Sequence, residues 1–336
     1  MTTTGAAPRL LLLTLGGTIG SEYDAQAGAH GVVPTSGADA FVPELAPWLD
    51  GVGVVPRELR MLPSPSLLLE DVLALRGAVA DAAREGFDGV VVAQGTDTLE
   101  ETAYVLDVLG AASELPVVVT GAMRDREAAG PDGPANLIAA IDVARSPDAR
   151  GHGVLVTFAD EVHAGRYVRK QSATHAAAFT SAPWGPVGLV HEREAHLPLV
   201  TRASPVLPVP PAGAPVPAVA LVGTGMGDDL RVLRALPDLG YAGAVLEGMG
   251  GGHVSARAVE AVHAAAAAVP LVLCSRAGVG PTMRRTYGYP GGDIDLLDRG
   301  LIWGGSLTGP KARLLLTLCL MSATDDLAEV FAQHVW

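Results

Sequence analysis

Residues 10–20 read LLLLTLGGTIG, and residues 90–102 read VVVAQGTDTLEET. Each stretch is an apolar, strand-like run that breaks into a glycine turn and then presents a threonine, Thr18 in the first and Thr96 in the second. In an open parallel sheet, the carboxyl ends of the strands deliver their turns to a common crevice where ligands bind. We therefore expect Thr18 and Thr96 to face one pocket.

The glycines of the two turns favour an anionic ligand. Glycine lets the backbone approach a ligand closely, and the N–H groups at the start of a following helix carry partial positive charge. The turns at Gly17 and Gly95 therefore predict a site for a carboxylate or for a developing oxyanion.

The rest of the chain alternates between strand-like and helix-compatible segments. Strand-like runs occupy 10–13, 90–92, 117–119 and 154–158, and helix-compatible stretches occupy 70–85, 99–109 and 134–143. This alternation is typical of βαβ units in a doubly wound parallel sheet. Residues 185–200 hold two apolar runs around a polar centre, which predicts a hairpin capping the first domain.

Proline and alanine dominate residues 203–217, which is the composition of a stiff extended linker. A second βα series follows, with strands expected at 218–222, 243–246 and 271–274 and a closing helix at 311–322. The predicted fold is therefore α/β. Two doubly wound parallel-sheet domains, Rossmann- or flavodoxin-like, are expected at 1–202 and 218–336, joined by the Pro-rich linker 203–217.

The composition limits the classes of partner. A chain of 336 residues with 49% hydrophobic residues can bury a large core. A net charge of −13 disfavours nucleic acid and membrane surfaces, because phosphate binding needs clustered Lys and Arg. A small polar substrate fits better. No apolar run reaches the roughly 18 residues of a membrane span, and residues 10–13 are too short for a signal-peptide core. We therefore expect a cytoplasmic protein.

Cysteine and lysine are both scarce. Cys274 and Cys319 lie in apolar runs, so we expect two buried free thiols rather than a disulfide. Lys170 and Lys311 are the two lysines among 23 basic residues, and the other 21 are arginine. A partly buried lysine can lose its proton and act as a base, whereas an arginine cannot. A GC-rich coding bias is the alternative explanation for both lysines.

Over nearly its whole length, the chain resembles the bacterial L-asparaginases of type I and II. The family signature T-G-G-T-I corresponds to residues 15–19, and H-G-T-D-T-M-E-E-T-A corresponds to residues 94–103. Further matching segments lie at 121–124, 132–137, 165–170 and 310–313. The resemblance implies hydrolysis of L-asparagine to L-aspartate and ammonia without a cofactor or a metal, and leaves room for minor glutaminase activity.

The resemblance also assigns roles to residues. Thr18 is implied as the nucleophile that forms an acyl-enzyme ester, and Thr96, Asp97 and Lys170 as a second catalytic set. A threonine hydroxyl is a weak nucleophile until a base takes its proton, and a lysine beside a carboxylate can relay that proton. Which threonine attacks first stays open. The implied substrate-binding residues are Gly17, Ser64, Gly95, Thr96, Asp97 and Ala122, the last through its carbonyl.

This chain departs from the family pattern at several positions. A Ser-Gln pair holds the substrate in the family, and Ser64-Pro65 stands there in this chain, so that one side-chain hydrogen bond is lost. The tyrosine behind the nucleophile has no clean counterpart, although Tyr23 is near. Lys311 matches a family helix start, where we expect a charge at the subunit surface.

The resemblance further implies a homodimer or a homotetramer built as a dimer of dimers. In such an assembly, His253 and Asp293 are the candidates to reach the active site of a neighbouring subunit. A loop histidine satisfied by its own surroundings is the alternative interpretation of His253.

Other interpretations of these motifs stay open. Without the family, Thr18 is read as a helix N-cap, and residues 96–98 as a cap followed by the first-turn acids Glu100 and Glu101. His191 and His196 are five residues apart and share no helix face, so they predict no zinc site.

Two alternative functions stay open. Residues 223–228 read GTGMGD after a strand-like run, with Glu247 ending the next one, which favours a dinucleotide-binding protein. Asp228 argues against it, because it replaces the third glycine and adds negative charge beside the pyrophosphate. The other alternative is an amidase of another small amide. The amidase subunit of a tRNA-dependent amidotransferase is disfavoured, because that relative carries an extra N-terminal domain and here the first motif begins by Thr14.

Overall fold

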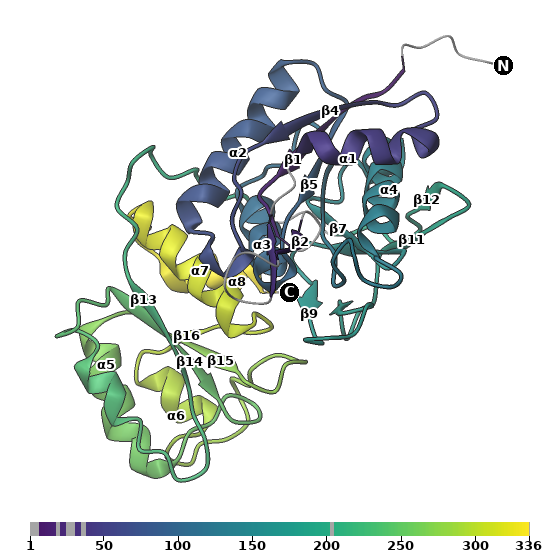
Figure 1. The fold of residues 1–336 in the computed structure, drawn as a ribbon. Coiled ribbons are helices and arrows are strands. Elements are labelled where there is room, and N and C mark those ends of the chain that lie inside the picture. Colours follow the sequence, from purple (N-terminus) through teal and green to yellow (C-terminus); the bar gives the residue numbers. More distant parts are fainter. Residues whose placement is uncertain (1–6, 18–20, 25–30, 35–37, 202–204, 336) are drawn as a thin grey trace. The chain divides into compact units, whose positions relative to one another are not determined.

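The structure is a computed structural model that describes residues 7–17, 21–24, 31–34, 38–201 and 205–335. The chain divides into two compact units, residues 1–206 and 207–336 (Figure 1). Each unit holds its own sheet and its own hydrophobic core. The finer boundaries expected above, with a linker at 203–217, stay a prediction.

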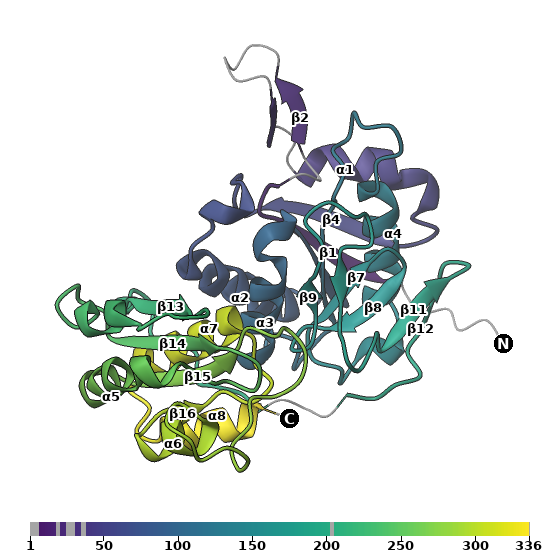
Figure 2. The same cartoon turned by 90° about the horizontal axis from the view of Figure 1, so that it is seen from below.

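The first unit is built on one mixed sheet with the strand order β12-β11-β8-β7-β6-β5-β1-β4. The strands β4, β1, β5, β6 and β7 run parallel, and β8, β11 and β12 continue the sheet antiparallel, side by side in Figure 2. Their bounds are β1 (Arg9–Thr14), β4 (Gly53–Glu58), β5 (Gly89–Ala93), β6 (Val117–Thr120), β7 (Leu155–Phe158), β8 (Glu161–Ala164), β11 (Gly188–His191) and β12 (Glu194–His196).

The parallel strands take the flavodoxin-like order, in which the second strand lies outside the first and the later strands follow on the other side. The strand order therefore reverses between β1 and β5. In sheets of this kind, ligands bind beyond the carboxyl ends of the strands at that reversal. The glycine turns of residues 16–17 and 95 follow these two strands.

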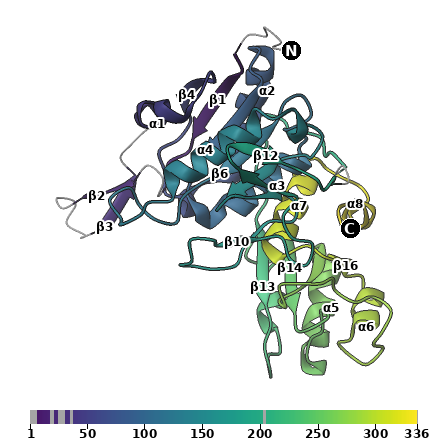
Figure 3. The ribbon, with the colours of Figure 1, turned by 90° about the vertical axis from the view of Figure 1, so that its right-hand side faces the viewer.

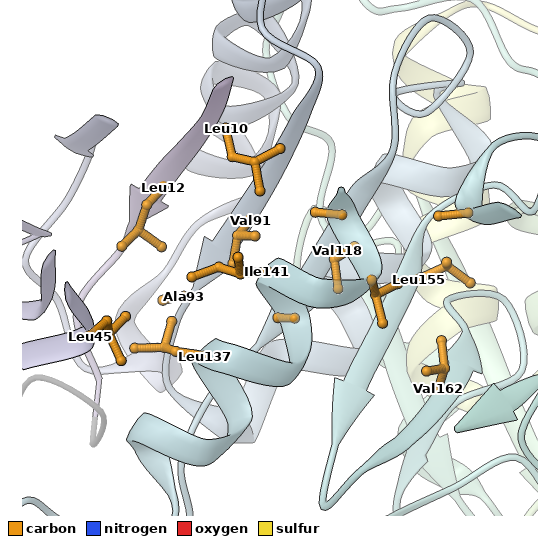
Figure 4. Packing of buried hydrophobic residues seen from close by; sticks show 14 of the residues in the cluster. Leu10, Leu12, Leu45, Val91, Ala93, Val118, Leu137, Ile141, Leu155 and Val162 are labelled. Carbon is orange, nitrogen blue, oxygen red and sulfur yellow. The ribbon is translucent and has the colours of Figure 1, made fainter. Parts of the chain in front are cut away.

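Helices cover both faces of this sheet. The helices α1 (Ala38–Leu45) and α4 (Gly133–Ala144) pack on one face, where Ile141 of α4 lies beside Val91 of β5 and Leu137 lies beside Ala93 (Figure 4). The helices α2 (Leu69–Arg84) and α3 (Leu99–Val108) contact the sheet through β5 and β6. Strands covered on both faces must be apolar at every position, which explains the unbroken runs at 10–13 and 90–92.

The expected hairpin at 185–200 is present as β11 and β12, and it extends the sheet at its antiparallel edge. Its turn residues Glu192 and Arg193 have φ values of 51° and 67°, which is the backbone of a tight hairpin turn. Arg193 holds both carboxylate oxygens of the buried Asp142 on α4, at 2.5 and 2.9 Å. The hairpin is thereby fixed to α4.

Shorter elements complete the first unit. An antiparallel ribbon is formed by β9 (Arg169–Lys170) and β10 (Phe179–Thr180), and another by β2 (Ser21–Asp24) and β3 (Gly31–Pro34). Single turns of 3-10 helix are η2 (Ala46–Trp48), η3 (Ser64–Ser66), η4 (Thr96–Thr98) and η5 (Pro147–Ala149).

The second unit contains a parallel sheet whose described strands follow chain order, β13 (Val219–Gly223), β14 (Gly243–Gly248), β15 (Leu271–Ser275) and β16 (Ile302–Trp303). The helices α5 (Val259–Ala268) and α6 (Asp293–Asp298) share a core with β14 and β15 (Figures 1 and 3). The helix α7 (Gly309–Met321) contacts β13, β14 and β15, and α8 (Leu327–His334) contacts β16. The 3-10 turns are η6 (Arg231–Ala235) and η7 (Ala256–Ala258).

Two α/β units, one with a mainly parallel sheet and one with a parallel sheet, confirm the predicted fold class. Cys274 and Cys319 are free and buried as expected, and burial raises the pKa of Cys319 to about 11. The expectation for Lys311 is wrong, because its exposed fraction is 2%. Lys311 lies in the first turn of α7, which packs across the sheet and is buried along most of its length. None of the described helices combines the length and the hydrophobicity of a transmembrane segment.

Candidate active site

The two glycine turns meet beyond β1 and β5. Gly17 has a φ of +93°, and a Cβ added there would lie 2.1 Å from the backbone nitrogen of Gly95. A Cβ added to Gly95 would lie 2.7 Å from Oγ of Ser64. Backbones this close leave no room for a side chain, so glycine is required at both positions. Three segments, at 17, 64 and 95, therefore meet at the reversal of strand order. Thr18 lies outside the described residues.

Lys170 joins this junction from the β9–β10 ribbon. Its Nζ lies 2.8 Å from Oγ1 of Thr96 and 2.6 Å from Oδ1 of Asp97. Thr96 is buried, the Lys170 side chain is 15% exposed, and the Asp97 side chain is 60% exposed. The structure thus brings Thr96, Asp97 and Lys170 together, with Asp97 as the member open to solvent.

This geometry suits proton transfer. A protonated Lys170 donates to both oxygens, and after losing a proton its Nζ lies within reach of the Thr96 hydroxyl proton. The Asp97 carboxylate balances the ammonium charge. The alternative interpretation of residues 96–98 as a cap is correct in position, because Thr98 is the N-cap residue of α3 and Glu100 and Glu101 stand in its first turn. No side-chain cap hydrogen bond forms at η4 or α3, and the Thr96 oxygen instead accepts from Lys170.

A chain of hydrogen bonds ties Ser64 to the second turn. The backbone N–H of Asp97 donates to Oγ of Ser64 at 3.2 Å, and the Thr98 hydroxyl donates to the Ser64 carbonyl at 3.1 Å. Gln94 donates from Nε2 to the Gly95 carbonyl at 3.2 Å and to Oγ1 of Thr98 at 3.4 Å. Pro65, next to Ser64, is exposed.

Sequence reasoning assigned no catalytic or substrate-binding role to Gln94 and Thr98. Gln94 ends the apolar run of β5 and is fully buried, and a buried amide must find hydrogen-bond partners in the protein. That signal, a polar residue at the end of a buried strand, was available in the sequence. Its partners were not, because they depend on where residue 64 returns to the sheet.

Ala122 lies in the turn after β6 and is buried. Two residues at the start of α4 shape this turn. The carboxylate of Asp132 accepts from the backbone N–H of Met123 at 3.0 Å and of Arg124 at 2.9 Å. Asn136 donates to the Gly121 carbonyl at 3.0 Å. The sequence matched this segment as a motif, and the structure adds its function of fixing the Ala122 backbone.

His253 and Asp293 belong to the second unit. Asp293 is buried and accepts from the backbone N–H groups of Thr286 at 2.9 Å and Tyr287 at 2.8 Å. Burial raises its pKa, but these backbone hydrogen bonds outweigh burial and the pKa lies below its usual value. Asp293 therefore shapes its own loop. His253 Nδ1 lies 3.1 Å from the Tyr289 hydroxyl. A contribution of either residue to a neighbouring subunit stays a prediction.

The alternative motifs lack the context they need. His191 and His196 are exposed, and the described part of the chain contains no group of His, Cys, Asp or Glu arranged for a metal ion. The turn after β13 leads into the 3-10 turn η6, which gives no α-helix N-terminus for a pyrophosphate. Glu247 accepts from the backbone N–H of Gly309 at 3.2 Å, so its carboxylate holds the start of α7.

The sequence matches two family descriptions, "Asparaginase, N-terminal" over residues 9–200 and "Glutaminase/Asparaginase C-terminal domain" over residues 218–332. The chain belongs to the asparaginase family. It is 35% identical to a probable L-asparaginase of Deinococcus radiodurans, covering 98% of both chains. It is 32% identical to the L-asparaginase of Bacillus licheniformis, covering 96% of this chain and 98% of the relative.

The fold agrees with this asparaginase membership. The crystal structure of a probable cytoplasmic L-asparaginase from Campylobacter jejuni superposes with a TM-score of 0.86 at 27% identity, covering 97% of this chain and 99% of that chain. The prediction of an enzyme of the L-asparaginase type is confirmed. In this asparaginase, the junction of Gly17, Ser64 and Gly95 and the group of Thr96, Asp97 and Lys170 form the candidate active site.

Proposed function

We propose that this asparaginase hydrolyses the side-chain amide of L-asparagine to L-aspartate and ammonia through a threonine nucleophile. The observation that carries the proposal is the position of Lys170 Nζ, within hydrogen-bond distance of both Thr96 Oγ1 and Asp97 Oδ1. A hydroxyl, a lysine and a carboxylate in contact are the parts that nucleophilic or water-activating catalysis requires.

In the proposed reaction, the Thr18 hydroxyl oxygen attacks the amide carbon and its proton passes to the leaving nitrogen. The carbon–nitrogen bond then breaks, ammonia leaves and an ester to Thr18 remains. A water molecule whose proton is taken by the group of Thr96, Asp97 and Lys170 attacks this ester, which releases L-aspartate and restores the Thr18 hydroxyl. The role of Thr18 rests on the family resemblance.

The surrounding backbone supports the substrate in this proposal. The N–H groups of the two glycine turns stabilise the oxyanion of the tetrahedral intermediate, and a single donor of this kind contributes a few kcal/mol. The Ala122 carbonyl accepts from the substrate amide. Ser64 holds the α-carboxylate and Asp97 the α-ammonium.

The proposal also predicts weak binding. A buried zwitterion must exchange water for hydrogen bonds at both charged ends. Pro65 supplies no side-chain partner, and one missing bond to a charged group weakens binding by roughly tenfold to a hundredfold. We therefore expect a KM for L-asparagine nearer the millimolar than the micromolar range. Glutamine is expected as a poorer substrate.

Ammonia release from L-asparagine, D-asparagine and L-glutamine, measured side by side over a range of concentrations, tests the proposal. The expected order of kcat/KM is L-asparagine, then L-glutamine and D-asparagine. Release from another small amide but not from L-asparagine would overturn the substrate. If no free amide released ammonia, the proposed amide hydrolysis would be wrong.

We also propose a location, the absence of a cofactor or metal, and domain boundaries. We propose a cytoplasmic location, supported by the similarity to the probable cytoplasmic L-asparaginase from Campylobacter jejuni. We propose that the asparaginase acts without a cofactor or metal, so that dialysis against EDTA leaves kcat unchanged. We propose the domain boundaries 1–202 and 218–336 with the linker 203–217.

A further inference from the structure

Lys170 is poorly anchored by its own strand. The strand β9 consists of two residues and pairs with β10 in a ribbon separate from the main sheet. In that ribbon Lys170 lies opposite Phe179, and the next residue, Gln171, donates its N–H to the Ala178 carbonyl at 2.7 Å. Antiparallel pairs alternate between hydrogen-bonded and non-hydrogen-bonded. The Lys170–Phe179 pair is therefore the non-hydrogen-bonded one, and the Lys170 N–H points away from β10.

That N–H donates to Oε2 of Glu100. Glu100 is the second residue of α3, directly after η4. Residues 96–100 therefore supply the acceptors for both the side chain and the backbone of Lys170, through Thr96, Asp97 and Glu100. Leu99, between them, is fully buried, which fixes this segment to the core.

We propose that Glu100 is a positioning residue that sets the backbone of Lys170, and thereby the place of its Nζ against Thr96 and Asp97. The inference rests on the proposed function of Lys170. A lysine side chain has many rotamers, so contacts at its tip alone hold its position at an entropic cost. A second contact at its backbone reduces that freedom, and a misplacement of about 1 Å can lower a rate by about a hundredfold.

Glu100 also stands in the first turn of α3, where any acid interacts favourably with the helix dipole. The two roles require different features of the side chain. To position Lys170, the side chain needs an acceptor oxygen as far from its backbone as Oε2 of glutamate. To interact with the helix dipole, it needs a negative charge. Glu100→Gln keeps the oxygen and removes the charge, and Glu100→Asp keeps the charge but withdraws the oxygen by one methylene.

The first experiment measures kcat and KM of both variants with L-asparagine. Positioning predicts that Glu100→Gln stays within about threefold of the wild-type kcat, while Glu100→Asp falls at least about tenfold with KM changed by less than about threefold. The reverse order would overturn the inference. Glu70→Ala is the matched control, because Glu70 is an exposed first-turn acid of α2, and we expect it to leave kcat unchanged.

The second experiment combines Glu100→Asp with Lys170→Met. If Glu100 acts through Lys170, the second substitution adds less than about twofold to the loss in kcat caused by Lys170→Met alone. If Glu100→Asp lowered kcat by the same factor in the Lys170→Met variant as in the wild type, Glu100 would have a merely structural role. If Lys170→Met is inactive and Glu100→Asp is fully active, positioning is wrong while the proposed function stands. If Lys170→Met is active, the proposed function itself fails.

Discussion

In the proposed mechanism, the chemistry of the site depends on Lys170. It reaches Thr96 and Asp97 from a different part of the chain, and its ammonium is shielded while Asp97 is mostly exposed. The chain uses arginine for nearly all its other positive charges, with Lys311 as the second lysine. A base must lose its proton during turnover, which lysine can do and arginine cannot.

Lys170→Arg should therefore be nearly as damaging as Lys170→Met, although it conserves the charge. We expect both variants to lower kcat for L-asparagine by at least about a hundredfold, measured as ammonia release under saturating substrate. A near-normal rate for Lys170→Arg would reduce Lys170 to an electrostatic partner of Asp97.

At the scale of single residues, the sequence singled out Thr96, Asp97 and Lys170 as candidates but did not show every contact around them, and their catalytic roles stay a prediction. Thr96 and Asp97 follow a buried strand in a motif, and Lys170 stands out by its rarity, so all three were accessible. The contact of Glu100 with the Lys170 backbone was not, because it depends on the register of the β9–β10 ribbon. The burial of Lys311 could not be predicted from the sequence. The apolar pattern of a helix shows which face is buried, but it does not show whether another element covers one of its ends.

The glycine turns after β1 and β5 are the elements that bring the site together. They cross so closely that the position of one backbone fixes the other. The strand runs and the hairpin were readable from apolar periodicity, whereas the flavodoxin-like order was not. Strand order depends on the direction in which each connecting segment crosses the sheet. The residues of a single strand carry no pattern that shows this direction.

Gly17→Ala should abolish activity and lower Tm, because its Cβ would lie 2.1 Å from the Gly95 nitrogen at a φ of +93°. Gly51→Ala is the control. Gly51 also has a positive φ, of +71°, but a Cβ there meets nothing within 4 Å. Activity and thermal unfolding of both variants are measured together. If Gly17→Ala changes activity and Tm no more than Gly51→Ala does, backbone strain alone explains both changes. The close approach of Gly17 to Gly95 would then have no functional importance.

The strand β8 carries a buried histidine that should make stability depend on pH. His163 lies 3.0 Å from the Ser181 hydroxyl, and burial lowers its pKa to about 4. Glu161 lies 3.4 Å from its Nε2 but is half exposed, so solvent screens its attraction. In the unfolded chain the histidine binds a proton below about pH 6.5. The contribution of His163 to the free energy of unfolding is therefore fully present above about pH 6.5 and is lost as the pH drops toward 4.

The total contribution of this histidine is on the order of 3 kcal/mol across that window. His163→Gln removes the titrating group, so the free energy of unfolding in urea should fall less steeply between pH 6.5 and 4.5 than in the wild type. Parallel slopes for the two proteins would show that His163 does not contribute to the acid sensitivity.

At the scale of the whole molecule, the second unit exposes apolar and aromatic side chains on its loops. Val279, Met283, Tyr287 and Tyr289 are between 40 and 51% exposed. Exposed groups of this kind often mark interfaces between subunits. We expect a homodimer or a dimer of dimers, measured by sedimentation velocity at assay concentration. A fully active monomer would contradict this expectation and the proposed contribution of His253 or Asp293 to a neighbour.

We expect the group of Thr96, Asp97 and Lys170 to catalyse amide hydrolysis. Thr96→Val tests it most directly, because valine has nearly the shape of threonine and lacks the hydroxyl that Lys170 contacts. The measurement is kcat for ammonia release from L-asparagine by the variant and the wild type, with unchanged Tm as evidence of folding. We predict a loss of at least about a hundredfold. A variant that keeps more than about a tenth of the wild-type kcat, a loss under about 1.4 kcal/mol of transition-state stabilisation, would contradict the account.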